Sequence, residues 1–153
     1  MDPDESIRVT TIHKSALLPY SVEEMYALVN DIRAYPRFLP WCRSTAVLDD
    51  DPDHMRASIE LAKGPVNKTF TTINRLQKNK MIEMRLENGP FKHLQGFWRF
   101  DHLGEQACKV SLDMEFEFSS KVLSLAIGPV FSQICNSLVD AFHDRAKEVY
   151  GVR

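Results

Sequence analysis

Histidine is the side chain most often used for acid–base chemistry near neutral pH, and the five histidines of this chain are scattered along it. None belongs to an H-E-x-x-H pair or to another spacing that would place two metal ligands on one face. His13 and His93 are the two that we expect to approach an interior cavity. Each is either a general base or, as a lone histidine on a strand, a hydrogen-bonded structural residue. The spacing predicts no metal site.

A nucleophilic side chain needs a base held beside it. Ser15 and Cys42 have no histidine fixed nearby by the sequence, and G-x-S-x-G, P-loop and dinucleotide-binding glycine patterns are absent from the chain. The three cysteines, Cys42, Cys108 and Cys135, are odd in number and lack C-x-x-C spacing, which argues against disulfides and zinc. We therefore predict a protein that is not an enzyme and that requires no cofactor.

Two apolar segments are better candidates for binding. The segment 35–42, Tyr-Pro-Arg-Phe-Leu-Pro-Trp-Cys, is the densest aromatic cluster of the chain and is flanked by Arg43. The segment 122–131 is apolar nearly all round. It is either core, where the last strand passes into a helix, or an exposed lip that touches a membrane or a partner. In the second case the segment 35–42 would form the opposite lip.

The elements that would position these segments begin with a β-branched strand over 7–18. Ser21 and Glu24 have the spacing of a capping box, which predicts a short helix after residue 21. Asn30 and Asp31 can cap a second short helix over 32–35, which Pro36 would end. The acidic run 49–53 lacks calcium-loop spacing and is predicted to be a solvated turn.

Six more strands are indicated by apolar and polar residues that alternate with period two. We place them at 44–48, 55–61, 66–76, 82–87, 94–101 and 109–118, and the threonine-rich third of these has one wet face. Short turns between successive strands are typical of an antiparallel meander with one buried face.

The C-terminal stretch carries an apolar stripe with helical spacing from Val130 to Tyr150. With Pro129 in the first turn and Gly151 at the C-cap, the predicted helix has about twenty residues and a length of roughly 30 Å. The fold class is therefore α+β: a curved antiparallel sheet of about seven strands around a long C-terminal helix, with two short helices after the first strand.

Such a sheet wrapped on one helix leaves an apolar cavity, which is the default ligand site. The residues that we expect to line the cavity and its mouth are Tyr35, Phe38, Leu39, Trp41, Ile59, Met84, Phe91, Leu94, Trp98, Met114, Phe116, Leu125, Phe131, Ile134 and Leu138.

Length and charge narrow the function classes further. The 153 residues suit a single domain, 1–153, and the net charge of −2 argues against a DNA-binding protein. The N-terminus has neither a basic signal-peptide region nor an Arg-rich presequence. We expect a cytoplasmic, bacterial protein that is peripheral to the inner membrane if its lip contacts lipid.

Three stretches resemble one known family. They are Asn30-Asp31 with the segment 35–42, the run 89–100 (Gly-Pro-Phe-x-x-Leu-x-Gly-x-Trp-x-Phe), and the run 141–151 (Ala-Phe-x-x-Arg-Ala-x-x-x-Tyr-Gly). They are similar to the coenzyme Q-binding START-like proteins, within the wider polyketide cyclase/dehydrase-like superfamily. The resemblance spans about residues 11–151 and implies a helix-grip (START / Bet v 1-like) fold. It also implies that the cavity binds a polyprenyl quinone such as ubiquinone, in support of respiration. For some bacterial members it implies instead a ribosome association toxin that binds the large ribosomal subunit and blocks subunit joining.

Physical reasoning ranks these functions. An isoprenoid tail gains about 0.8 kcal/mol per buried methylene-sized group, and the apolar lips would screen the part of the tail that leaves the cavity. Ribosome binding would need clustered cations, for which the candidates are Lys63, Lys68, Arg75, Lys78, Lys80 and Lys92, interspersed with acids. We therefore expect quinone binding first, ribosome binding as the alternative, and a cyclase-type enzyme third.

Overall fold

The computed structural model describes residues 9–153. The element order is β1 (Thr10–Leu18), α2 (Val22–Asn30), the 3-10 helix η1 (Ile32–Arg37), β2 (Cys42–Asp50), β3 (His54–Lys63), β4 (Val66–Gln77), β5 (Met81–Asn88), β6 (Phe91–Gly104), β7 (Ala107–Phe118) and α3 (Lys121–Tyr150). The predicted order of one strand, two short helices, six strands and a long helix is confirmed. Ile7 and Arg8, where we expected the first strand to begin, lie outside the described residues.

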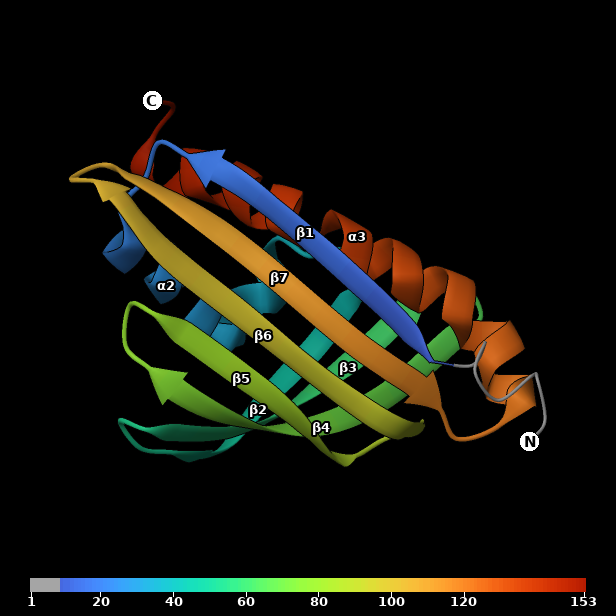
Figure 1. The fold of residues 1–153 in the computed structure, drawn as a ribbon. Coiled ribbons are helices and arrows are strands. Elements are labelled where there is room, and N and C mark those ends of the chain that lie inside the picture. Colours follow the sequence, from blue (N-terminus) through green and yellow to red (C-terminus); the bar gives the residue numbers. More distant parts are fainter. Residues whose placement is uncertain (1–8) are drawn as a thin grey trace.

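The seven strands form one antiparallel sheet in the order β1-β7-β6-β5-β4-β3-β2. Register shifts interrupt the pairing at Cys42/Ser44, Val47/Asp49, Thr71/Thr72, Phe91/His93 and His102/Gly104. Such bulges bend a strand and increase its twist. The sheet curls so that β1, β7 and β6 pass over one side of the molecule and β2, β3 and β4 over the other, with α3 running alongside (Figure 1). This is the predicted helix-grip arrangement.

The long helix starts earlier than we predicted. It begins at Lys121 and has 30 residues, because the Ser120 side chain caps it by accepting a hydrogen bond from the Leu123 amide. Pro129 therefore lies inside the helix and not in its first turn. The proline removes one backbone hydrogen bond, whereas Ile127 and Phe131 on either side of it are buried in the core and hold the helix to the sheet.

Two smaller predictions about the first helices also need correction. Pro36 does not end the second helix but lies within η1, whose tight turns run on to Arg37. Asp31 occupies the N-cap position of η1 without making a side-chain capping bond. The acidic turn is shorter than predicted, because Asp49 and Asp50 belong to β2.

Among the described residues, α3 is the helix that is long and apolar enough, by length and composition, to cross a membrane. In this fold its apolar stripe packs on the sheet, with Ile127, Phe131, Ile134, Cys135, Val139, Phe142 and Ala146 buried. Val122 and Leu125 remain 76% and 72% exposed. The segment 122–131 is thus helical, with one face in the core and one face in solvent.

The C-terminal end of α3 is fixed to α2 by hydrogen bonds. The predicted capping box is present: the Glu24 amide donates to Ser21 Oγ at 3.1 Å, and the Ser21 amide donates to Glu24 Oε1 at 3.0 Å. The Tyr150 hydroxyl donates to the Glu24 carbonyl oxygen at 2.9 Å. Arg153 donates to both carboxylate oxygens of Glu24, at 2.7 and 2.9 Å. One glutamate therefore caps α2 and pairs with the chain beyond α3.

The pKa of Glu24 is lowered from its ordinary value of 4.5, first by the hydrogen bonds from Arg153 and also by those from Ser21, while burial acts in the opposite direction. Because the folded carboxylate releases its proton more readily than the unfolded one, the unfolded chain binds the proton first as the pH falls. The stabilisation from this pair is therefore fully present above pH 4.5 and is lost as the pH falls through the lower folded pKa.

We expect Glu24→Gln to lower the free energy of unfolding by about 1–2 kcal/mol at pH 7, because glutamine keeps the capping box but loses the charge-assisted pair with Arg153. The loss should shrink as the pH is lowered below 4.5. Urea unfolding followed by circular dichroism at pH 7 and pH 3.5 measures both. Glu23→Gln, at the exposed neighbouring position, is the matched control. An equal effect of the two substitutions would contradict the role given to Arg153.

Candidate functional site

Two aromatic clusters attach α3 to the sheet. The Phe131 ring lies 4.8 Å from that of Phe116, 5.0 Å from Phe91, 6.1 Å from Phe118 and 6.2 Å from Phe70, between ring centroids. The Phe142 ring lies 5.4 Å from each of Tyr35, Phe38 and Trp98. Phe131 and Phe142 are three helical turns apart, or about 16 Å along the axis. The helix is therefore held at two points with smaller side chains between them.

An apolar cavity of about 70 Å³ lies between these two anchors. From α3 the smaller side chains of Ile134, Cys135 and Leu138 face it. The full lining is Tyr35, Trp41, Ile59, Phe70, Thr72, Met84, Leu94, Trp98, Met114, Phe131, Ile134, Cys135, Leu138 and Phe142. The cavity is where we predicted it, between the inner face of the sheet and the C-terminal helix.

A second chamber of about 40 Å³ adjoins the first and gives it a polar end. Tyr35, Ile59, Phe70, Thr72, Met84 and Trp98 line both chambers, and Asn30 and Asn74 line the second. The Thr72 hydroxyl donates to Asn74 Oδ1 at 2.8 Å. Within residues 9–153, Oδ1 of Asn30 is a buried side-chain atom without a hydrogen-bond partner. A buried acceptor of this kind is satisfied by a water or by a ligand group that donates a hydrogen bond.

The cavity is smaller than the 300–1,000 Å³ that we expected from typical ligand sites. Chambers of about 70 and 40 Å³ together hold a few water molecules and cannot enclose a quinone ring and its tail. The two flexible methionines fill part of the space, because Gly96 lies between them and a Cβ there would stand 2.6 Å from both Met114 Sδ and Met84 Cε. A larger ligand would have to displace these side chains.

The structure brings most of the predicted site residues together around the cavity, namely Tyr35, Trp41, Ile59, Met84, Leu94, Trp98, Met114, Phe131, Ile134 and Leu138. Phe38, Phe91 and Phe116 lie in the aromatic clusters. Leu39 lines a groove on the surface, and Leu125 points into solvent.

Several lining residues were not predicted from the sequence. Cys135 and Phe142 lie on the helical stripe and could have been inferred from it, as could Phe70 from its strand. Thr72 and Asn74 could not have been inferred, because we assigned the polar residues of β4 to its solvent-exposed face. In fact Thr72 and Asn74 are 5% and 2% exposed, whereas Ile73 between them is 43% exposed.

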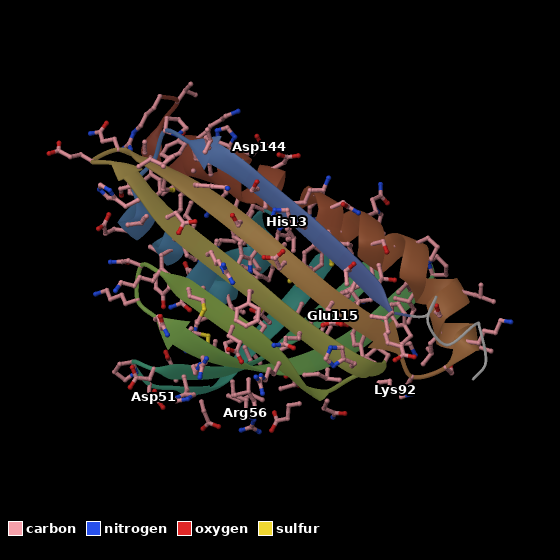
Figure 2. All side chains as sticks on the ribbon, in the orientation of Figure 1. His13, Asp51, Arg56, Lys92, Glu115 and Asp144 are labelled. Carbon is pink, nitrogen blue, oxygen red and sulfur yellow. The ribbon has the colours of Figure 1, made fainter. Side chains whose placement is uncertain are left out.

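The histidines that we expected near the cavity face away from it. Ile12 pairs with Met114 on the inner face, so His13 and its partner Asp113 lie on the outer face, where their side chains meet at 2.6 Å. His93 likewise lies outside, 3.5 Å from Glu115. Figure 2 shows His13 on β1 and Glu115 on β7, on the side of the sheet away from α3. Within residues 9–153 no three His, Cys, Asp or Glu side chains are grouped to hold a metal ion.

The six basic residues proposed for ribosome binding do not form one cluster. Arg75 is paired with Glu83 at 2.8 Å on the outer face. Lys63 and Lys68 flank the β3–β4 turn, whereas Lys78 and Lys80 lie at the β4–β5 turn. Lys68 on β4 and Lys78 just beyond its end are ten residue steps apart, or about 33 Å. Lys92 lies at the start of β6, towards the N-terminal end of α3 (Figure 2).

All three cysteines are buried free thiols. Burial raises the pKa of Cys42 and of Cys108 to about 11 and that of Cys135 to about 12. The thiolate is the nucleophilic form of cysteine. These thiols are therefore protonated at neutral pH and are unsuited to attack a substrate.

Comparison with known proteins places the chain among established families. Residues 18–143 match the family model described as "Polyketide cyclase / dehydrase and lipid transport". A Pseudomonas aeruginosa protein named "Ribosome association toxin RatA" is 48% identical over 142 residues, which cover 93% of this chain and 99% of that protein. A Xenopus laevis protein named "Coenzyme Q-binding protein COQ10 homolog B, mitochondrial" is 28% identical over 142 residues, which cover 90% of this chain and 58% of that protein.

Solved structures agree on the fold. A START superfamily protein from Mycobacterium smegmatis superposes with a TM-score of 0.77 at 18% identity, covering 91% of this chain and 98% of that chain. The Zhui aromatase/cyclase from Streptomyces superposes with a TM-score of 0.74 at 15% identity, covering 91% and 94%. At such low sequence identity, these superpositions show that the fold is shared and do not show that the function is. The same fold occurs both in enzymes and in proteins that are not enzymes.

The rate at which the cysteines react with a thiol reagent tests whether any of them is a reactive nucleophile. We expect the native chain to react very slowly with a thiol reagent at pH 7, since a thiol with a pKa of about 11 is ionised in about one molecule in 10,000 at that pH. Unfolding in guanidinium should release all three thiols to fast labelling. Mass spectrometry of alkylated protein over time measures both rates. A cysteine that is labelled rapidly in the native chain at pH 7 would contradict this description.

Proposed function

The chain belongs to the polyketide cyclase / dehydrase and lipid transport family, and from that membership we propose that it is a ribosome-associating protein that binds the large ribosomal subunit and opposes subunit joining. The observation that carries the proposal is the 48% identity to a ribosome association toxin over 93% of this chain and 99% of that protein.

The same proposal makes the chain a binding protein and not an enzyme. Its thiols are held protonated by burial. Its histidines near the sheet are paired with carboxylates on the outer face. Among the polar groups of the two chambers, Thr72 and Asn74 hydrogen-bond to each other, and Asn30 presents an amide oxygen that is unpaired within residues 9–153. None of these arrangements sets a base beside a nucleophile, which acid–base or covalent catalysis needs.

The order of the two leading functions is reversed relative to the sequence-based expectation. Quinone binding ranked first there because burial of an isoprenoid tail in the cavity is favourable and the candidate cations are interspersed with acids. The small volume of that cavity weakens the argument, and the relative with the ribosome-related name is far more similar than the coenzyme Q-binding relative, at 48% against 28% identity.

We expect expression of the chain from an inducible promoter in a bacterium to reduce the peak of joined ribosomes and to enlarge the free-subunit peaks in a sucrose gradient. The protein should co-sediment with the large subunit, because occupancy of the joining face excludes the small subunit. Immunoblots of the gradient fractions measure its position, and an empty vector is the control. Unchanged profiles, with the soluble chain present in excess over ribosomes, would contradict the proposal.

A second function is favoured by the geometry of the cavity. We propose that the cavity takes the ring of an apolar ligand of the polyprenyl quinone class, which enters after Met84, Met114 and Trp41 move aside. Quinone carbonyls only accept hydrogen bonds, so it is the reduced quinol ring, whose hydroxyls donate, that suits the apolar chamber with the buried acceptor Asn30 Oδ1 at one end. The exposed Val122 and Leu125 at the start of α3 suit peripheral contact with the inner membrane, from which such a ligand would come.

Organic extraction of the protein purified from membrane-containing lysate should yield a quinone. Leu125→Asp should lower the quinone content, because a charge at this exposed position weakens contact with lipid. Leu103→Asp is the matched control, since Leu103 is also exposed but lies at the β6–β7 turn. Chromatography of the extracts measures the ratio of quinone to protein. An extract without quinone, or an equal loss in both variants, would contradict this second function.

A further inference from the structure

A groove of about 490 Å³ lies on the surface between α3, the end of β3 and the connection from η1 to β2. Its lining consists of Leu39, Pro40, Trp41, Ala62, Lys63, Gly64, Gln133, Ile134, Ser137 and Ala141. The volume falls within the range of small-ligand sites. The groove is thus several times larger than the inner cavity and is open to solvent.

The charges around this groove are basic. Lys63 is the charged residue of its lining, and its Nζ donates to Gln133 Oε1 at 3.1 Å. Lys68 lies on the neighbouring strand on the same face, since Lys63 pairs with Val66 and Lys68 pairs with Leu61. At the far end, one helical turn beyond Ala141, the Arg145 guanidinium stands 5.0 Å above the Phe38 ring and is paired with Glu148 at 3.2 Å. Among the described residues, the free cations at the groove are therefore Lys63 and Lys68.

Three arginines on the outer face of the sheet are paired with carboxylates. Arg56 contacts Asp49 and Glu87, and Arg75 and Arg85 both contact Glu83. Of the residues in the described part of the chain, none forms an ion pair with Lys63 or Lys68 through a carboxylate. These two lysines are therefore available to phosphates at the groove.

The groove also offers a flat aromatic surface. Trp41 is partly exposed, whereas Trp98, the other tryptophan, is buried. Beside Trp41 the groove presents the side-chain amide of Gln133 and the hydroxyl of Ser137. Single-stranded nucleic acids are bound by this combination, in which bases stack on aromatic rings and phosphates meet lysine or arginine.

We propose that this groove binds an unpaired segment of RNA, with one base against Trp41 and the adjoining phosphates at Lys63 and Lys68. The proposal rests on ribosome association and names the contact: single-stranded ribosomal RNA at the joining face of the large subunit. It places the contact on the α3 side of the molecule and not on the charged outer face of the sheet.

The test uses the full chain and a labelled single-stranded RNA of twelve mixed nucleotides. Binding should quench the fluorescence of Trp41 while that of buried Trp98 stays unchanged, and Trp41→Phe should remove the quenching.

Lys63→Glu should weaken binding by about tenfold and reduce the slope of log affinity against log salt by about 0.7. Lys109→Glu, which makes the same charge change at an exposed position on β7, is the matched control and should leave affinity nearly unchanged. Ser137→Phe, at an exposed helix position, fills the groove without touching the core and should also weaken binding.

Sedimentation of the same variants with purified large subunits separates failure of this inference from failure of ribosome association. If the native chain binds subunits and Lys63→Glu and Ser137→Phe bind as well as Lys109→Glu, the groove is not the contact and this proposal is overturned. Ultraviolet crosslinking should give a nucleotide adduct on the peptide that contains Trp41. An adduct to a ribosomal protein in its place would overturn the RNA assignment. If the native chain does not bind subunits at all, ribosome association fails as well.

Discussion

The attachment of α3 to the sheet at two aromatic clusters determines where the inner cavity lies. Phe131 and Phe142 each sit among three or more aromatic rings from the sheet and from η1. Aromatic pairs with centroids 4.5–7 Å apart contribute about 0.5–1.5 kcal/mol each beyond the burial of their area, so both anchors are strong. Between them Ile134, Cys135 and Leu138 are too short to fill the space. The cavity is therefore a consequence of where the large rings are, and its size follows from the flexible methionines opposite.

The fold could be predicted from sequence where one periodicity dominated. In β7 every second residue from Val110 to Phe118 is large and apolar, and in β6 Leu94, Trp98 and Phe100 keep the same alternation around Gly96. These side chains do face the core. The prediction failed where two signals competed. Pro129 suggested a helix start, yet the Ser120 cap and the burial of Ile127 and Phe131 extend the helix two turns upstream of it. In β4 polarity suggested the wet face, yet Thr72 and Asn74 are buried because each satisfies part of the other's hydrogen-bonding capacity.

The residues of the candidate site could be predicted only in part from the sequence. Alternation identified which side chains of a strand share a face, and so identified most of the lining. It could not give the register between strands, which sends His13 and His93 outward, or the packing of α2 on the sheet, which brings Asn30 to the second chamber. Nor could it distinguish free cations from paired ones: Arg75 and Lys63 look alike in sequence, but only the structure places Glu83 beside the first. The outer groove depends on a turn, a strand end and a helix meeting in space.

Trp41 and Ile134 line both the inner cavity and the outer groove, so two side chains separate the two sites. A ligand that enters the cavity by moving Trp41 changes the surface on which RNA would stack. RNA stacked on Trp41 would in turn hold that side chain against the cavity. Linkage requires that each of two such ligands alter the affinity for the other by the same factor. On the two proposals made above, Trp41 would therefore border both binding surfaces, and occupancy of one would affect the other.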